Sequence, residues 1–310
     1  MLAALKNNSK IIVNTDIDGI FSALVLHNFL GCEIAGFCNS AETVWIDQSK
    51  IASIYDGVYI DMFVPRADVV CIDQHIVAVD EEHYRAIAAL GTKFNPNLDN
   101  PRFHLPSSSY YLKYPFGTVH YIIAHLEKNG LNLDLQLDNL VGQNLLFKDL
   151  LLRADDTMQT TVSSPYVQNA KDWWSWLKDF SEQGKTITQI CDYLHSLNSA
   201  DVAAKKTAAT KLLKDLYHCD SPDGGFKNIG DKNGFLQEKV KKYIRFLAKI
   251  SGLKVFDLEM KLEKKVGKAH RISLDTVLQS RLKTMNTEIF SYAFVRSAAR
   301  TENFSYTKMS

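Results

Sequence analysis

The alternation of short apolar runs with helix-like segments is the feature that most narrows the possible folds of this chain. Residues 10–15 (KIIVNT) form a β-rich run, and residues 20–30 (IFSALVLHNFL) follow with the apolar spacing of a helix. Three further strand-like runs come next, CEIAGFCN, GVYIDMFV and ADVVCIDQH. Because strands that alternate with helices form a mostly parallel sheet with helices on both faces, we expect an α/β fold whose N-terminal domain holds a parallel, doubly wound sheet.

Acidic residues and a histidine follow these predicted strands. They are Asp16 and Asp18 after the first run, Asp61 near the end of the third, and Asp73 and His75 at the end of the fourth. In such folds the carboxyl ends of parallel strands meet at one edge of the sheet, where ligands bind. We therefore expect these side chains to gather at one edge.

The rest of the chain predicts two further parts. Residues 41–55 look partly helical, and the proline-rich residues 92–117 predict a long loop. Helical patterns then continue to residue 218, and the Gly- and Asp-rich residues 221–234 mark a boundary between domains. Beyond this boundary a basic helix is predicted, followed by two strand-like runs, LKVFDLEM and EIFSYAFVRS. We expect a metal-binding domain over 1–160, a helical connector over 161–220 and a smaller, basic α+β substrate domain over 221–310, which is either complete or trimmed.

Charge is distributed unevenly along the chain, although the net charge is only +1. Residues 221–310 carry 18 Lys and Arg against 9 Asp and Glu, which leaves 18 and 26 for residues 1–220. An acidic part followed by a basic part suits a metal-binding half joined to an anion-binding half, although an ordinary solvated surface gives the same totals.

Composition and missing motifs limit the class of protein. The five cysteines show no CxxC spacing, which argues against a zinc ribbon or a disulfide framework and favours a reducing, cytoplasmic compartment. No run of about 18 apolar residues exists, so we expect no membrane span. The motifs GxSxG, HExxH and GxxxxGK[ST] are absent, so the chemistry of serine hydrolases, zincins and P-loop proteins is not indicated.

The stretch DIDG places two carboxylates at a predicted strand-to-helix turn, where Gly19 permits a tight backbone. The N–H groups and the dipole of the following helix favour a phosphate at this point. Asp18 would also serve as a helix cap, but one cap explains only one of the two acids. The pair therefore indicates a turn that binds a metal or a phosphate.

The later acids extend this pattern. Asp61 lies among apolar residues, where a carboxylate is costly unless it is paired or binds a cation. Asp73 and His75 add a carboxylate and an imidazole, a set that suits Mn²⁺ or Mg²⁺ and also Co²⁺ or Zn²⁺. A leucine-rich helix is predicted to end at Asp155 and Asp156, where acids oppose the helix dipole unless they bind a cation. Each of these residues could instead have a structural role, in a turn or as a helix cap.

Taken in order, four stretches resemble the motifs of the DHH phosphoesterase superfamily. NTDIDGIFSALVL is similar to the first motif in the DxDG form of RecJ-type exonucleases, and VYIDM resembles the second. CIDQHI resembles the third motif, an Asp-His-His triplet, and RADDT resembles the fourth. Order and spacing fit over roughly residues 10–160.

The resemblance implies a two-domain fold with a cleft that holds two divalent cations, or one, usually Mn²⁺ with Mg²⁺ as the alternative. The metal ligands that it implies are Asp16, Asp18, Asp61 and Asp155 or Asp156. Asp73 would orient these ligands or bind the metal in part, and His75 would contact the scissile phosphate or the metal. Substrates in the family include single-stranded DNA, short RNA oligonucleotides, cyclic dinucleotides and pyrophosphate.

The chain departs from the family pattern at two places. Gln74 replaces the first histidine of the triplet, generally a metal ligand, and a neutral amide oxygen is a poorer ligand for a transition metal, although tolerable for Mg²⁺. The glycine-rich segment that normally ends the smaller domain is missing. Arg296 and Arg300 are the nearest candidates for phosphate contacts.

These observations predict a metal-dependent phosphoesterase that hydrolyses phosphodiester bonds of single-stranded nucleic acid, short oligonucleotides or related nucleotides through a metal-activated water. Tyr110, Tyr111 and Tyr114 in the predicted loop could stack bases. The alternative is a catalytically impaired protein of the same fold that binds nucleic acid, a nucleotide or a protein partner, which Gln74 motivates. A third hypothesis is an unrelated α/β protein whose strand-end acids are caps.

Overall fold

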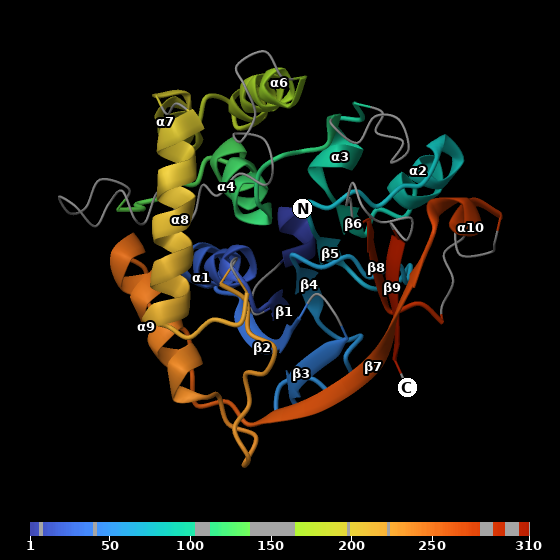
Figure 1. Cartoon of the computed structure of the whole chain (residues 1–310), viewed down its shortest axis with the longest axis vertical. Coiled ribbons are helices and arrows are strands. Elements are labelled where there is room, and N and C mark those ends of the chain that lie inside the picture. Colours follow the sequence, from blue (N-terminus) through green and yellow to red (C-terminus); the bar gives the residue numbers. More distant parts are fainter. Residues whose placement is uncertain are drawn as a thin grey trace.

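A large sheet, curled and partly parallel, dominates the computed structural model of this chain (Figure 1). The structure describes residues 1–5, 9–39, 42–102, 112–136, 165–196, 199–221, 224–279, 288–294 and 304–309. Within these residues nine strands pair in the order β6-β5-β4-β1-β2-β3-β7-β9-β8. The strands are β1 (Lys10–Asn14), β2 (Glu33–Cys38), β3 (Thr43–Asp47), β4 (Val58–Ile60), β5 (Cys71–Ile72), β6 (Lys93–Phe94), β7 (Leu262–Ile272), β8 (Ser291–Phe294) and β9 (Phe304–Met309).

The five strands from β6 to β2 are parallel, and β1 lies among them next to β2 and β4. The chain passes from β1 through helix α1 (Ile17–Leu30) to β2, whereas β4, β5 and β6 follow one another in the opposite direction. The connections therefore diverge between β1 and β4. In parallel sheets of this kind, a crevice opens at such a point, outside the carboxyl ends of the strands.

The remaining strands are antiparallel and curl the sheet. β3 pairs with β2 and with the long strand β7, which carries the sheet on to β9 and β8 (Figure 1). Phe290, just before β8, contacts Tyr59 of β4 with ring centroids 5.7 Å apart. The C-terminal hairpin formed by β8 and β9 thus packs against strands of the parallel half.

Helices cover one face of the parallel half. Alternate strand residues, among them Ile11, Val13 and Ile60, form one buried cluster with residues of six helices. These helices are α1, α4 (Thr118–Lys128), α6 (Pro165–Phe180), α7 (Lys185–Ser196), α8 (Ser199–Asp215) and α9 (Glu238–Ser251). A short 3₁₀ helix at Leu2–Leu5 adds Leu5 to the same cluster.

The opposite face is covered differently from what the sequence predicts. Ile12, Tyr59 and Cys71 pack there with residues of the loops after β3 and β4 and with Phe290, and no helix residue of the described chain belongs to this cluster. The expected helices on both faces are therefore confirmed on one face only. The described chain is a mixed α/β protein in which the C-terminal hairpin takes the place of a second helical layer.

A third cluster joins the hairpin to the segment that follows β5. Residues 76–79 pack against Tyr292 and Phe294 of β8 and Phe304 of β9, and the Tyr292 hydroxyl donates a hydrogen bond to the Val77 carbonyl. Short helices border this region: α2 (Glu81–Ala88), α3 (Pro96–Asp99) and α10 (Leu274–Gln279).

Three local predictions are wrong. The proline-rich segment 92–117, expected to be a long loop, contains strand β6 and helix α3 in its described part. The segment 41–55, expected to be partly helical, contains strand β3 followed by turns. The run LKVFDLEM (253–260) forms no strand, and the strand that follows it, β7, is mostly exposed and rich in lysine, so apolar alternation does not identify it. The predicted domain boundaries at 160 and 220 stay a prediction, because β7 of the C-terminal part extends the same sheet through its pairing with β3. None of the described helices combines the length and apolar character that a membrane span requires.

Candidate metal centre

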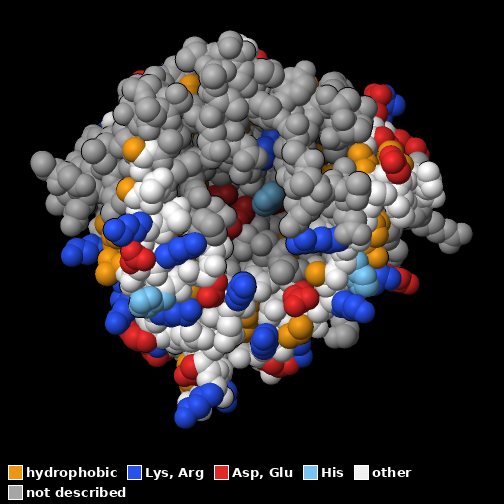
Figure 2. All heavy atoms as spheres, in the orientation of Figure 1, with side chains coloured by type: hydrophobic (Ala, Val, Ile, Leu, Met, Phe, Trp, Pro, Cys, Tyr) orange, Lys and Arg blue, Asp and Glu red, His pale blue; other side chains and the backbone are white. Residues whose placement is uncertain are grey.

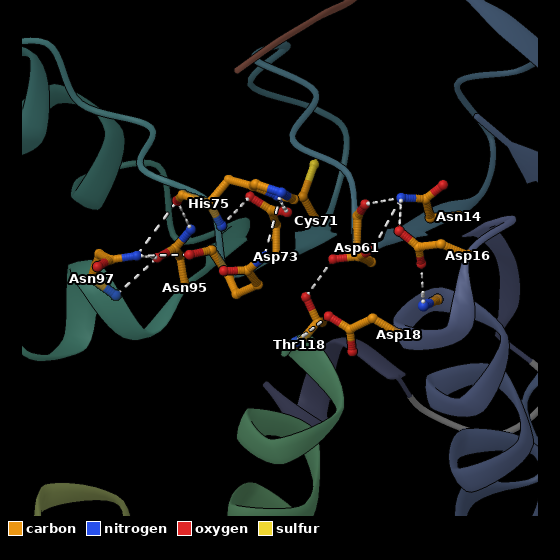
Figure 3. A network of polar contacts seen from close by, with 12 residues as sticks. Asn14, Asp16, Asp18, Asp61, Cys71, Asp73, His75, Asn95, Asn97 and Thr118 are labelled. Atoms are coloured by element: carbon orange, nitrogen blue, oxygen red, sulfur yellow. Dashed lines mark hydrogen bonds and ion pairs between the residues drawn. The ribbon is translucent and has the colours of Figure 1, made fainter. Parts of the chain in front are cut away.

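The carboxyl ends of four parallel strands bring the polar side chains of the candidate site together. β1 ends at Asn14 and leads to Asp16, β4 leads to Asp61, β5 to Asp73 and β6 to Asn95. Backbone bonds continue the ladder one residue beyond the strands, from Asp61 N to Ile72 O (2.8 Å) and from Asp73 N to Phe94 O (3.0 Å). The gathering of these strand-end residues at one edge, expected from the sequence, is observed (Figure 3).

Asp61 lies at the centre of the site and is only 3% exposed. Its φ of 60° lies in the left-handed region, which costs a non-glycine residue about 1–3 kcal/mol and is maintained only where the surroundings fix the backbone. Both carboxylate oxygens accept hydrogen bonds, Oδ1 from Thr118 Oγ1 (2.8 Å) and Oδ2 from Asn14 Nδ2 (3.0 Å). Both of these donors are neutral, so hydrogen bonds from uncharged groups orient this carboxylate.

Burial and crowding make the ionised form of Asp61 unfavourable. Its pKa is raised well above the ordinary 3.8, first by burial and then by the negative charges of Asp18, Asp16 and Asp73. The pKa of Asp18 is also raised, because the effect of burial exceeds the opposite effect of two backbone N–H groups that donate hydrogen bonds to its carboxylate. Carboxylates that share a site repel one another unless a proton or a cation lies between them. The centre is therefore electrostatically suited to a cation.

Asp73 and His75 form a tight pair beside Asp61. Asp73 is 1% exposed, and its Oδ1 lies 2.7 Å from His75 Nδ1 while its Oδ2 accepts the His75 backbone N–H at 3.1 Å. A carboxylate at Nδ1 favours the tautomer with the proton on that nitrogen, which leaves Nε2 as the nitrogen that accepts a proton or a metal bond.

Ligand atoms of Asp61, Asp73 and His75 lie within 4.8 Å of one another. Two carboxylate oxygens and one imidazole nitrogen suit Mn²⁺, Mg²⁺ or Zn²⁺. The burial of both carboxylates and the raised pKa of Asp61 fit the same kind of occupant. These three residues could hold one divalent cation, and Asp16 lies next to them because Asn14 Nδ2 contacts both Asp16 Oδ2 (3.2 Å) and Asp61 Oδ2.

The two acids of DIDG cap different helices, which corrects the argument that a cap explains only one of them. Asp16 is the N-cap of α1, because its Oδ1 accepts the N–H of Gly19 at 3.0 Å. Asp18 accepts from the first turn of α4, with Oδ2 2.6 Å from Thr118 N and Oδ1 2.9 Å from Val119 N. Both Asp18 oxygens are thus engaged by the backbone of another helix.

The Gln74 side chain contacts the imidazole of His75. Its side-chain nitrogen lies 3.3 Å from His75 Nε2, and its backbone carbonyl accepts from Asn97 Nδ2 at 2.8 Å. The Gln74 amide therefore lies beside the ring nitrogen of His75 that does not face Asp73.

Four neutral residues of the site were missed from the sequence: Asn14, Asn95, Asn97 and Thr118. The two asparagines of the β6–α3 turn are 1% exposed and hold the carbonyls of Gln74 and His75, through bonds from Asn95 Nδ2 to His75 O and from Asn97 Nδ2 to Gln74 O, both 2.8 Å. Asn14 carries a usable signal, since it is a polar residue at the end of an apolar strand, whereas Asn95 follows a strand of only two residues, Lys93 and Phe94, that no apolar run marks. Thr118 carries none, because nothing in its local sequence connects it with Asp61.

Several predicted residues cannot be placed. Asp155 and Asp156, Arg296 and Arg300, and also Tyr110 and Tyr111 lie outside the described residues. Tyr114 is described and is fully buried, packed edge-on against Phe116 and Trp173, so the prediction that it stacks bases is wrong.

The surface around the centre is hollowed. Figure 2 shows a depression near the middle of the view, with acidic side chains and a histidine inside it and several lysine or arginine side chains around it. His75 keeps 38% of its side chain exposed, which is consistent with a site that solvent and small molecules can reach. No family model matches the chain, and no curated protein and no solved structure matches it either.

Proposed function

We propose that this protein is a metal-dependent phosphoesterase that hydrolyses phosphodiester bonds of single-stranded nucleic acid, short oligonucleotides or related nucleotides. The observation that carries the proposal is the group formed by the buried Asp61 and Asp73 and the partly exposed His75, whose ligand atoms lie within 4.8 Å of one another. The resemblance of the sequence to the DHH superfamily adds the reaction class. The proposal includes a division of labour between a metal-binding part built on the parallel strands and a basic C-terminal part that holds substrate.

The donor set indicates how the site would work. Asp61, Asp73 and His75 would hold a Mn²⁺ or Mg²⁺ ion, and Asp16 is close enough to serve a second one. A divalent cation in such a site lowers the pKa of a bound water and stabilises negative charge on phosphoryl oxygens.

The chain's own groups would orient that chemistry. Asp73 fixes the His75 ring through Nδ1, so Nε2 can accept a proton or a bond. The β6–α3 asparagines fix the backbone under His75. The hollow seen in Figure 2 would admit a substrate to these groups, and lysines or arginines near it would attract a phosphate backbone.

One observation favours the second candidate, a catalytically impaired protein that binds nucleic acid, a nucleotide or a protein partner. The Gln74 amide lies against His75 Nε2, so both ring nitrogens of His75 have a hydrogen-bonding neighbour. In that arrangement a metal bond at Nε2 requires the Gln74 side chain to move away.

Calorimetric titration with Mn²⁺ and Mg²⁺, followed by hydrolysis assays, tests the proposal. We expect metal binding together with metal-dependent cleavage of fluorescent five-nucleotide RNA or DNA, and loss of both in Asp61→Asn. Metal binding without cleavage of either oligonucleotide or of bis(p-nitrophenyl) phosphate would favour the binding protein. The absence of binding at millimolar metal would reject the metal centre itself.

A further inference from the structure

The first turn of α4 connects Asp18 with Asp61 (Figure 3). The backbone N–H groups of Thr118 and Val119 donate to the two oxygens of Asp18, at 2.6 and 2.9 Å. The Thr118 side chain donates from Oγ1 to Asp61 Oδ1 at 2.8 Å. Thr118 is completely buried. A single residue therefore joins the two acids, with its backbone on one and its side chain on the other.

The approach of α4 to Asp18 is close and depends on the residue before Thr118. A Cβ atom at Gly117 would lie 2.7 Å from an oxygen of the Asp18 carboxylate and 2.8 Å from its carbon, closer than real Cβ contacts. Glycine at this position allows the helix to close over the carboxylate. The same closure brings the Thr118 hydroxyl into hydrogen-bonding range of Asp61.

The bond from Thr118 fixes the orientation of Asp61. Asn14 Nδ2 holds Oδ2 and Thr118 Oγ1 holds Oδ1, so neither oxygen can rotate away without breaking a buried hydrogen bond. A carboxylate oxygen has two lone-pair sites, and one stays available for a cation after each of these bonds has formed. The donors therefore orient the carboxylate and leave it able to bind an ion.

We infer that Asp18 and Thr118 are positioning residues of the metal centre. Asp18 docks the start of α4 against α1, and the docked Thr118 holds Asp61 in the orientation that binds a divalent cation. This inference rests on the proposed function, because it requires that Asp61 binds metal. It gives Asp18 an indirect role in place of the direct ligation implied by the resemblance to the DHH superfamily.

A pair of substitutions at Thr118 tests the role of its hydroxyl. Thr118→Val keeps the shape and removes the donor, whereas Thr118→Ser keeps the donor. Loss of a hydrogen bond that orients a metal ligand typically weakens metal affinity by about 10- to 100-fold. In titrations of the full chain with Mn²⁺, we expect a loss of this size for the valine variant, and the serine variant should stay within about threefold of the wild type.

A second pair of substitutions tests Asp18 and supplies a matched control. Glu127 makes the same kind of cap far from the centre, since its carboxylate accepts from Thr186 N (2.6 Å) and Ile187 N (3.0 Å) at the start of α7. Asp18→Asn and Glu127→Gln each weaken one such cap. We expect both to lower the unfolding temperature, but only Asp18→Asn to weaken Mn²⁺ binding. This pair carries the test if Thr118→Val does not fold.

The outcomes separate this inference from the proposed function. Wild-type protein that binds no Mn²⁺ overturns both. Wild-type protein that binds Mn²⁺, together with Thr118→Val or Asp18→Asn variants of unchanged affinity, overturns the positioning role alone. Equal loss in Thr118→Val and Thr118→Ser, or in Asp18→Asn and Glu127→Gln, would also overturn it, because general destabilisation would then explain the effect.

Discussion

Replacing Asp61 with asparagine removes one charge from the candidate metal centre while both hydrogen bonds of the side chain can persist. The amide oxygen can accept from Asn14 Nδ2, and the amide nitrogen can donate to the Thr118 hydroxyl, which accepts as readily as it donates. The two side chains are nearly equal in size. The variant therefore tests the charge of Asp61 without opening a cavity in a buried site.

Without metal, the Asp61→Asn variant should be more stable than the wild type, increasingly so as the pH rises. Folding raises the pKa of Asp61 well above 3.8, mainly by burial. A carboxyl group with a raised pKa contributes stability that is fully present below its unfolded pKa and is lost as the pH rises through its folded pKa. Asparagine does not ionise, so the variant avoids this loss.

With metal, the order should reverse. An ion at 100 times its Kd stabilises the folded state by about 2.7 kcal/mol. At about 2 cal/mol/K per residue, the unfolding entropy of a 310-residue chain is about 0.65 kcal/mol/K, so one ion raises the Tm of the wild type by about 4 °C. Without the central carboxylate, the shift in the variant should fall below about 1 °C.

Thermal unfolding followed by fluorescence, in EDTA and in MnCl₂ or MgCl₂ at pH 6, 7 and 8, measures both effects. Asp47→Asn is a suitable control, because Asp47 is a buried carboxylate at the end of β3 that bonds Ser49 and is not part of the site. A variant at position 61 that keeps the full Mn²⁺ shift would show that Asp61 is not a ligand. A variant less stable than the wild type in EDTA at pH 8 would contradict the electrostatic argument.

Three further substitutions test other parts of the structure. Gln74→His places a second imidazole beside His75 and should tighten Mn²⁺ or Zn²⁺ binding in calorimetry; unchanged affinity would mean that position 74 does not reach the ion. Burial lowers the pKa of His120 to about 4, so the free energy of unfolding should fall by about 2 kcal/mol between pH 7 and pH 5, because the unfolded state takes up a proton over this range. The variant His120→Gln can keep the cap of α4 but cannot take up this proton. Urea unfolding at the two pH values should therefore show a smaller fall for the variant than for the wild type. Gly19→Ala would place a Cβ 2.3 Å from the Asn14 carbonyl oxygen and should cost about 1–3 kcal/mol or more in the same urea assay; a neutral effect would show that α1 can shift away from β1.

Four of the five strands of the parallel half, β1, β2, β4 and β5, were predictable because local sequence determines them, whereas β6 lies in a segment predicted as a loop. Apolar runs of the right length end in polar residues, and the order of strands and helices implies where those ends meet. Strand β7 was not predictable in this way, since most of its side chains are exposed and its partners β3 and β9 lie far away in sequence. The hairpin that covers the second face depends on the same distant pairing.

The residues of the candidate site also differ in whether local sequence predicts them. Asp61, Asp73 and His75 follow directly from strand ends, and the structure brings them together. The contact of Asp18 with α4 could not be predicted, because its partner Thr118 is 100 residues further along the chain. A sequence pattern identifies acidic residues near the ends of strands. It does not identify the distant helix whose first backbone N–H groups will donate hydrogen bonds to their carboxylates.

The bond from Tyr292 to Val77 has a consequence for how the protein is made. The two residues are 215 positions apart, which a ribosome covers in about 10–40 s at 5–20 residues per second. During that interval the apolar residues 76–79, directly after His75, lack the hairpin that later buries them. In a nascent chain this apolar segment, next to the candidate metal ligands, therefore lacks its hairpin partners until the ribosome has passed β8 and β9, and full assembly of the region must wait for that point.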